Sequence, residues 1–202
     1  MRERIALAIV LAGLFTTANG CKKPVDRAPL LAALNKSYDG EHVCLWPQPI
    51  KLPAEADPSK DEKVRGYDAL TDAGLLMRQY VEKKQSRISS IQINKYTLTD
   101  KGHSAWTPDP HHPELGNFCF GHFNVTAIDK ATPNDSSNPT QYTVHYSYEV
   151  EGIPGWARTP ESMRAFRQVA ADTSIQSSTA TLVKAADGGW TVAGVSPQRS
   201  AL

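Results

Sequence analysis

The sequence predicts an α+β protein, with helices and a β-hairpin in its first half and an antiparallel sheet with one packed helix in its second half. Three patterns support this fold class. Apolar residues recur every three or four positions over residues 26–38 and 62–76, which is typical of amphipathic helices. Residues 142–150 alternate apolar and polar side chains, which is typical of a strand with one buried face. Residues 187–189 read Asp-Gly-Gly between two further strand-like runs and predict a tight hairpin turn.

The start of the chain has the composition of an export signal. Charged residues at positions 2–4 precede the apolar run Ile5–Phe15, and small residues follow before Cys21. A mature membrane helix needs roughly 20 apolar residues, so this run is too short to span a bilayer. We therefore predict that residues 1–20 are a signal peptide that is removed from the mature protein.

Cys21 directly follows this segment and resembles the lipid-attachment residue of bacterial lipoproteins. The resemblance implies that Cys21 carries acyl chains, that residues 21–27 form a lipid-anchored tether, and that Lys22 directs the protein to the outer membrane. Ala18 and Asn19 depart from the Leu-Ala-Gly-Cys pattern of that family, and ordinary signal-peptide cleavage at the same place would leave Cys21 unmodified. Export is predicted in either case.

The cysteine count predicts a disulfide bond. The chain has three cysteines, and acylation of Cys21 leaves Cys44 and Cys119 as an even pair in an oxidising compartment. We expect these two residues to be bonded, and the alternative is a pair of buried free thiols. By the loop-entropy relation, such a bond contributes on the order of 4 kcal/mol to stability.

The balance of charge argues against nucleic acid as a partner. The chain has 22 Lys and Arg residues and 21 Asp and Glu residues, and the predicted signal peptide holds Arg2, Arg4 and Glu3. The mature protein therefore has no formal net charge, whereas proteins that bind nucleic acid usually show a basic excess.

The first elements follow from short-range patterns. Residues 26–38 predict a helix with Asp26 as its N-cap and Pro29 in its first turn. Val43–Trp46 predicts a short strand. The closely spaced prolines of residues 47–58 predict a segment without regular structure.

A helix, a hairpin and a short helix are predicted next. The second helix covers residues 62–76. Residues 77–81 and 88–97 alternate with a two-residue period and predict the hairpin strands. Thr99 is the expected N-cap of a short helix that reaches Trp106.

The second half begins after a proline-rich linker predicted at residues 107–116. Phe118–Ile128 predicts a strand with a bulge at Gly121, because the apolar phase shifts there. Tyr142–Val150 is the clearest strand, and Pro160–Ala171 predicts the helix that packs on the sheet. Ser178–Ala185 and Trp190–Val195 are the expected last two strands. The aromatic residues expected in the core under the predicted helix are Phe118, Phe120, Phe123, Tyr142, Tyr146, Tyr148, Trp156 and Trp190.

Two segments of the first half resemble the winged-helix domains of bacterial transcription regulators. A helix that ends in Ala-Gly-Leu within Tyr67–Leu76 leads into the hairpin, and Tyr96–Gly102 reads Tyr-Thr-Leu-Thr-Asp-Lys-Gly at the start of the next helix. The resemblance implies a winged-helix-like subdomain over 28–106, followed by an antiparallel α+β subdomain over 117–198. DNA binding is not expected, because an exported protein does not meet the chromosome and because residues 41–58 are too proline-rich for a recognition helix.

The mature sequence is also similar to uncharacterised secreted or lipoprotein families of Proteobacteria. The shared motifs are Phe-Cys-Phe-Gly at Phe118–Gly121 and Trp-Ala at Trp156–Ala157. Those families imply no activity.

Histidines are the first candidates for chemistry. His103, His111, His112 and His122 lie close together in the sequence, and imidazole is a ligand for zinc and copper. Their spacing fits no metal-binding motif, so we predict no metal site and keep the four residues as weak candidates. Cys119 near His122 could form a catalytic pair, but a disulfide would remove its thiol.

These observations favour a non-catalytic binding or scaffolding module without a cofactor. We predict an outer-membrane lipoprotein that faces the periplasm or the cell surface, with an envelope protein or a glycan as its partner. One alternative is an envelope metal-binding protein or hydrolase that uses the cluster His103–His122. Another alternative is a carrier that holds a small ligand in the C-terminal sheet.

Overall fold

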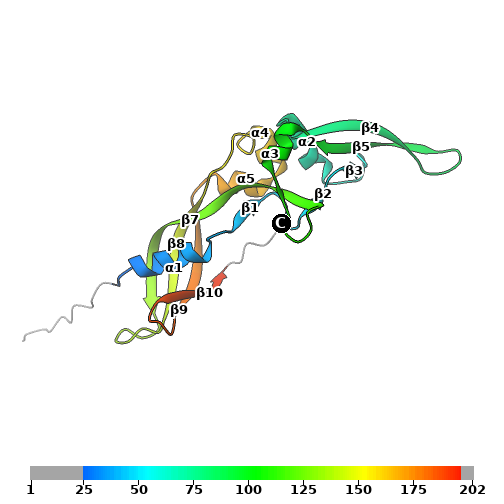
Figure 1. Ribbon diagram of the computed structural model, residues 1–202. Helices are drawn as coiled ribbons and strands as arrows, with labels where there is room; N and C mark the ends of the chain where they lie inside the picture. Colours follow the sequence, from blue (N-terminus) through cyan, green and yellow to red (C-terminus); the bar gives the residue numbers. More distant parts are fainter. Residues whose placement is uncertain (1–24, 197–202) are drawn as a thin grey trace, which may run out of the picture.

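The computed structural model describes residues 25–196, so the predicted signal peptide and Cys21 lie outside the described residues. The described part consists mostly of antiparallel strands with few helices, which confirms the mixed α and β class (Figure 1). It is elongated, with a curled sheet at one end and a long hairpin at the other.

The larger sheet is built around one long strand. Its strands are β1 (His42–Cys44), β2 (Ile50–Lys51), β6 (Trp106–Pro108), β7 (Leu115–Pro133), β8 (Gln141–Glu151), β9 (Gln176–Lys184) and β10 (Trp190–Ser196). The strand order is β1-β7-β8-β9-β10, and β2 and β6 also pair with β7. The predicted alternation of β8 is confirmed, because Tyr142, Val144, Tyr146 and Val150 are buried. All of these pairings are antiparallel.

Irregularities in the pairing of β7 with its neighbours change which of its side chains are buried. The predicted bulge beside Gly121 is confirmed, because the pairing with β1 skips one residue of β7 there. The pairing of β7 with β8 shifts twice more, at Thr126 and at Asp129. These shifts place Val125 and Ile128 on the buried side although they are three residues apart.

The smaller sheet has the order β3-β5-β4. Its strands are β3 (Ala54–Ala56), β4 (Leu76–Lys84) and β5 (Ser90–Leu98), so the predicted hairpin is confirmed. The expectation that residues 47–58 lack regular structure is wrong. The short strands β2 and β3 lie between the prolines, where each residue still has an N–H group to pair.

The helices are short. They are α1 (Ala28–Ser37), α2 (Val64–Asp72), α3 (Asp100–Ala105), α4 (Pro160–Ala165) and α5 (Arg167–Asp172). The predicted cap at Thr99 is confirmed, because its hydroxyl accepts a hydrogen bond of 2.9 Å from the Gly102 N–H. The predicted cap at Asp26 is wrong, because the N-cap residue of α1 is Arg27. α2 ends earlier than predicted, since Gly74 has a φ of 74° and the chain enters β4 directly. The helix predicted over 160–171 is broken at Phe166, whose φ is −122°.

The first hydrophobic core lies in the middle of the molecule. It joins α2, α4 and α5 to β1 and to the start of β7. Phe166 packs on α2 at Gly66, where a Cβ atom would come within 2.9 Å of the phenylalanine ring. The Trp46 ring lies 5.7 Å from Phe166 and 5.8 Å from Tyr67, measured between ring centroids.

The second hydrophobic core lies under α1. Leu30 and Leu34 are fully buried against residues of β7, β8 and β9. The Asn35 side chain fixes the helix to β7, because its amide donates to the Val125 carbonyl at 3.1 Å and accepts from the Val125 N–H at 2.8 Å. The Tyr38 and Tyr146 hydroxyls lie 2.6 Å apart, and burial raises the pKa of Tyr38 well above its usual value.

The helices pack on other elements than the sequence predicts. The expectation that Pro160–Ala171 covers the sheet of tyrosines is wrong, because α1 covers it while α4 and α5 pack beside α2. Both segments carry apolar residues at helical spacing, and this local pattern does not tell which element each one packs on. The predicted core aromatics are therefore divided, with Phe118 and Phe120 in the first core and Tyr142 and Tyr146 in the second.

Residues 107–116 do not form the predicted linker. Trp106 pairs with Phe118, and the Asp109 N–H donates to the Leu115 carbonyl at 3.0 Å, so β6 and β7 form a hairpin. The two cores consequently do not follow the predicted boundary between 28–106 and 117–198, because each core takes residues from both ranges.

Candidate functional site

The candidate site is a groove beside the bond between Cys44 and Cys119. It has a volume of about 440 Å³ and is lined by side chains from residues 42–49, 107–110 and 116–123. We call it the disulfide groove. Its volume lies in the range of small-molecule and side-chain binding sites.

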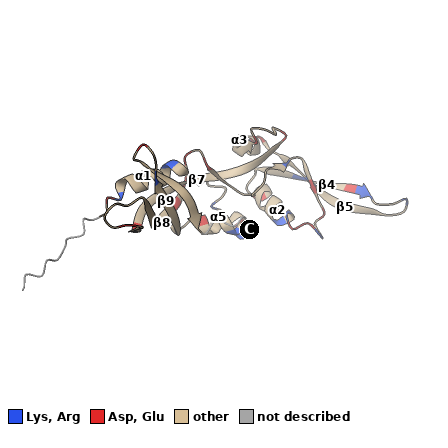
Figure 2. Cartoon of the chain, turned by 90° about the horizontal axis from the view of Figure 1, so that it is seen from below, with Lys and Arg blue, Asp and Glu red and all other residues tan. Residues whose placement is uncertain are grey.

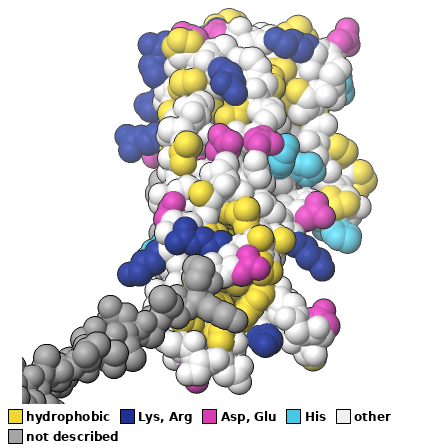
Figure 3. Space-filling view, turned by 90° about the vertical axis from the view of Figure 1, so that its left-hand side faces the viewer, with side chains coloured by type: hydrophobic (Ala, Val, Ile, Leu, Met, Phe, Trp, Pro, Cys, Tyr) yellow, Lys and Arg dark blue, Asp and Glu magenta, His cyan; other side chains and the backbone are white. Residues whose placement is uncertain are grey.

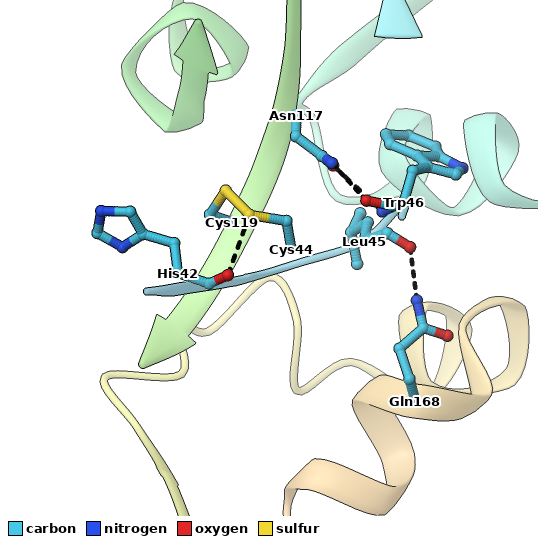
Figure 4. The surroundings of a disulfide bond; sticks show 7 residues. All are labelled: His42, Cys44, Leu45, Trp46, Asn117, Cys119 and Gln168. Atoms are coloured by element: carbon cyan, nitrogen blue, oxygen red, sulfur yellow. Dashed lines mark hydrogen bonds between the residues drawn. A yellow bond between two sulfur atoms is a disulfide. The ribbon is translucent and has the colours of Figure 1, made fainter. Parts of the chain in front are cut away.

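The predicted disulfide is confirmed. Cys44 and Cys119 face each other on β1 and β7, with a sulfur–sulfur distance of 2.02 Å (Figure 4). The Cys44 Sγ atom also lies 3.6 Å from the His42 carbonyl oxygen. Because β1 has few residues, this covalent bond fixes one wall of the groove to the central strand.

Two side-chain amides hold the chain next to the disulfide. The Asn117 amide donates to the Trp46 carbonyl at 2.6 Å and accepts from the Trp46 N–H at 3.2 Å. The Gln168 amide donates to the Leu45 carbonyl at 2.6 Å from the side of α5 (Figure 4). Asn117 is 7% exposed, so this contact is part of the folded core rather than a free binding group. The groove is therefore largely preformed.

Prolines and an aromatic ring form the walls. Pro47 and Pro49 come from the segment after β1, Pro108 ends β6, and Pro110 lies in the turn between β6 and β7. Phe123 lies at the β7 side, where its ring centroid is 5.1 Å from that of Tyr38. Since proline has no N–H group and a fixed φ, these walls present rigid apolar surfaces.

Asp109 adds a negative charge to the groove. Its Oδ1 atom accepts hydrogen bonds from the backbone N–H groups of His111 and His112, at 2.9 and 2.8 Å. These bonds lower the pKa of the Asp109 carboxyl, so it stays ionised at neutral pH.

The histidines predicted as weak metal candidates are distributed over separate elements. His103 lies on α3, His111 and His112 lie in the turn after β6, and His122 lies on β7. Within residues 25–196, no group of three or more His, Cys, Asp or Glu side chains is arranged to hold a metal ion. Figure 3 shows histidine side chains at the surface next to acidic ones. His112 lies 3.7 Å from Glu114 and His122 lies 3.6 Å from Glu151.

Sequence reasoning missed His42, which lines the disulfide groove. It lies opposite His122 in the pairing of β1 with β7. The predicted strand Val43–Trp46 begins one residue too late to include it, and a strand that began at His42 would have placed it on the same face as Cys44.

A second groove of about 440 Å³ lies between α2 and α4, but three of the five charged side chains that line it, Asp68, Glu161 and Arg164, already form ion pairs. Arg78 lies 2.7 Å from Asp68, and Arg164 lies 2.7 Å from Glu161. The Tyr96 hydroxyl also donates to Asp68 at 2.8 Å, and burial raises the pKa of Tyr96 to about 12. The disulfide groove is therefore the better candidate for a ligand.

No family model, curated protein or solved structure matches this chain. In the described part of the chain, none of the helices has the length and apolar character needed to cross a membrane.

Proposed function

We propose that this protein is a non-catalytic binding module of the cell envelope, held at the outer membrane through Cys21. In this proposal, the disulfide groove receives an aromatic or other apolar side chain from an extended segment of another envelope protein. The observation that carries the proposal is the pair of proline walls, Pro47 with Pro49 and Pro108 with Pro110, on either side of a preformed groove.

The chemistry of the walls supports this class of ligand. An aromatic ring can lie flat against proline rings and against Phe123, where it loses its contact with water. The backbone segment that carries Pro47 is fixed by Asn117, so little ordering is needed when a ligand binds. Asp109 can accept a hydrogen bond from a donor group of the ligand, such as an indole or phenol.

The order α2, β4, β5, α3 supports the further proposal that this part is a winged-helix-like scaffold that has lost DNA binding. In that arrangement, β4 and β5 are the wing, and Thr99 caps the helix that follows it.

A panel of fluorescein-labelled decapeptides that differ only in the central residue tests the groove. We expect peptides with a central Trp or Tyr to bind with dissociation constants of about 100 µM or lower, and peptides with a central Lys or Gly to bind roughly tenfold more weakly.

Pro110→Glu places a charge at the wall of the disulfide groove and is expected to weaken binding of the Trp peptide about tenfold, or about 1.4 kcal/mol. Fluorescence polarisation measures these affinities.

Pro113→Glu is the matched control, because Pro113 is an exposed proline of the same turn that does not line the groove. Its affinity for the Trp peptide should equal that of the unaltered protein. Equal affinities for all central residues would contradict the proposal, as would tighter binding of a peptidoglycan fragment than of every peptide.

Cys21→Ala is expected to move the protein from the membrane fraction to the soluble periplasmic fraction, because the acyl chains supply the membrane affinity. Fractionation of cells that express each form measures the change, and intact-mass spectrometry should show acyl chains on Cys21 as the first residue. The double variant Cys44→Ala/Cys119→Ala is the control and should stay in the membrane fraction. An unmodified Cys21 in the mature protein would contradict the proposed lipid anchor, but it would leave the proposed ligand binding in the disulfide groove unaffected.

A further inference from the structure

The β4–β5 hairpin projects from the end of the molecule (Figure 1). A cavity lies beside it. The cavity has a volume of about 300 Å³ and lies between β3 and the outer part of the hairpin. Its lining includes Ala56, Ile91, Ile93 and Lys83. We call it the β5 slot.

The floor of the slot is apolar. Val81 lies opposite Ile93 and Lys83 lies opposite Ile91, so these four side chains share one face of the sheet. Ile93 is only 4% exposed, yet it belongs to neither of the two hydrophobic cores. Ile93 is therefore buried outside both hydrophobic cores.

A charged pair closes one side of the slot. Lys83 on β4 lies 3.0 Å from Glu55 on β3, and the strand order puts β5 between them. The register places Glu55 opposite Lys95 and Lys83 opposite Ile91, so the pair crosses β5 at Ile93. Its aliphatic stems account for the low exposure of Ile93.

The edge of β5 next to the slot is open. β3 pairs with β5 only as far as Ala56 opposite Asn94, whereas β5 begins at Ser90. Residues 90–93 extend the strand by roughly 13 Å. Along this stretch no strand among residues 25–196 pairs with β5 on the β3 side. Alternate residues of a strand turn their N–H and C=O groups to the same side, so unpaired backbone groups border the slot.

We propose that the β5 slot binds an extended segment of a partner protein, which pairs with residues 90–93 of β5 as a strand in line with β3. An open strand edge is complementary to an extended backbone, and an adjoining apolar cavity selects one side chain of that segment. A β-branched or leucine side chain of the segment fills the slot beside Ile91.

The charges around the slot favour an acidic partner. Glu55 is paired with Lys83, and the Asp57 carboxylate is paired with Lys60, whose Nζ atom lies 3.7 Å from Asp57 Oδ2. Lys84 also lines the slot and forms no ion pair in the described part of the chain. In Figure 2, an acidic and a basic stretch of the ribbon lie next to each other near the end of β4. A partner segment with an acidic residue beside its apolar residue therefore matches the slot.

Alternately N-methylated peptides test strand pairing without changing the protein. The probes are fluorescein-labelled octapeptides of alternating Val and Thr that end in two Glu residues, N-methylated either at every Val or at every Thr. Only one of the two sets of N–H groups can face β5. We expect one N-methylated peptide to lose about tenfold in affinity relative to the unmodified peptide, and the other to keep it within about twofold.

Two isoleucines of the hairpin provide matched variants. Ile91→Thr replaces an apolar side chain in the floor of the slot by a polar one and is expected to weaken binding about fivefold. Ile88→Thr makes the same change at a side chain that is 98% exposed and outside the slot, and it should leave binding unchanged. Lys84→Glu should weaken binding of the acidic peptide and strengthen binding of the same peptide ending in two Lys residues.

Several outcomes would overturn the proposal. These are no binding of the unmodified peptide at millimolar concentration, equal losses for both N-methylated peptides, or equal effects of Ile88→Thr and Ile91→Thr. A concentration-dependent dimer in analytical ultracentrifugation that Ile91→Thr disrupts would assign the slot to a second copy of this chain instead. Pro110→Glu should not affect any of these measurements, which separates the slot from the disulfide groove.

Discussion

Replacing Cys44 and Cys119 together by alanine is expected to lower the free energy of unfolding by about 4 kcal/mol. The bond joins residues separated by 75 positions, so it removes much conformational freedom from the unfolded chain. It also holds β1, which precedes the buried Leu45, against the central strand β7. Urea unfolding of the double variant and the unaltered protein, followed by far-ultraviolet circular dichroism, measures the difference.

Reduction provides an internal control for this prediction. A thiol reductant should destabilise the unaltered protein by a similar amount and should not affect the double variant. Cys21→Ala, which changes the third cysteine, should unfold at the same urea concentration as the unaltered protein. A loss of less than about 1 kcal/mol in the double variant would show that the disulfide does not constrain the fold as proposed.

Leu34→Ala is expected to lower the free energy of unfolding by about 3 kcal/mol. Leu34 is fully buried and belongs to the second core, where α1 covers β7, β8 and β9. Alanine would remove its contacts with the sheet and leave a cavity that the paired strands cannot close by moving. Thermal and urea unfolding followed by circular dichroism measure this loss.

Leu31→Ala is the matched control, because Leu31 lies on the same helix and is only half-buried. Its expected loss is less than half of that for Leu34→Ala, since less apolar surface leaves water when it folds. Equal losses for the two variants would contradict the assignment of α1 as the cover of the sheet.

Much of the local structure could be predicted because it depends on neighbouring residues. The two-residue period of Tyr142–Val150 is confirmed by β8, and the alternating runs around residue 85 are confirmed by β4 and β5. Thr99 caps its helix through a bond to a residue three positions later. The disulfide followed from the cysteine count, because two of three cysteines remained after Cys21 was set aside.

The placement of the helices and the groove could not be predicted from such patterns. α1 and α4 both have apolar residues on one face, and contacts between distant segments decide that α1 packs on the larger sheet while α4 packs beside α2. The groove walls come from Pro47 and Pro49 on one side and from Pro108 and Pro110 on the other, which meet only because β1 and β6 pair with the same strand. In the sequence, these prolines predicted loops alone.

Each of the two cores combines segments from the beginning and the end of the chain, and this affects the order in which the chain can fold. α1 is made first, but the second core also needs Leu182 on β9. The first core, which includes Tyr67, is completed only by Val169. During synthesis from the N-terminus, neither core can therefore be completed until almost all of the chain has emerged from the ribosome. Such a polypeptide therefore lacks a completed hydrophobic core for most of its synthesis, and its apolar segments stay exposed until the last strands and helices are made.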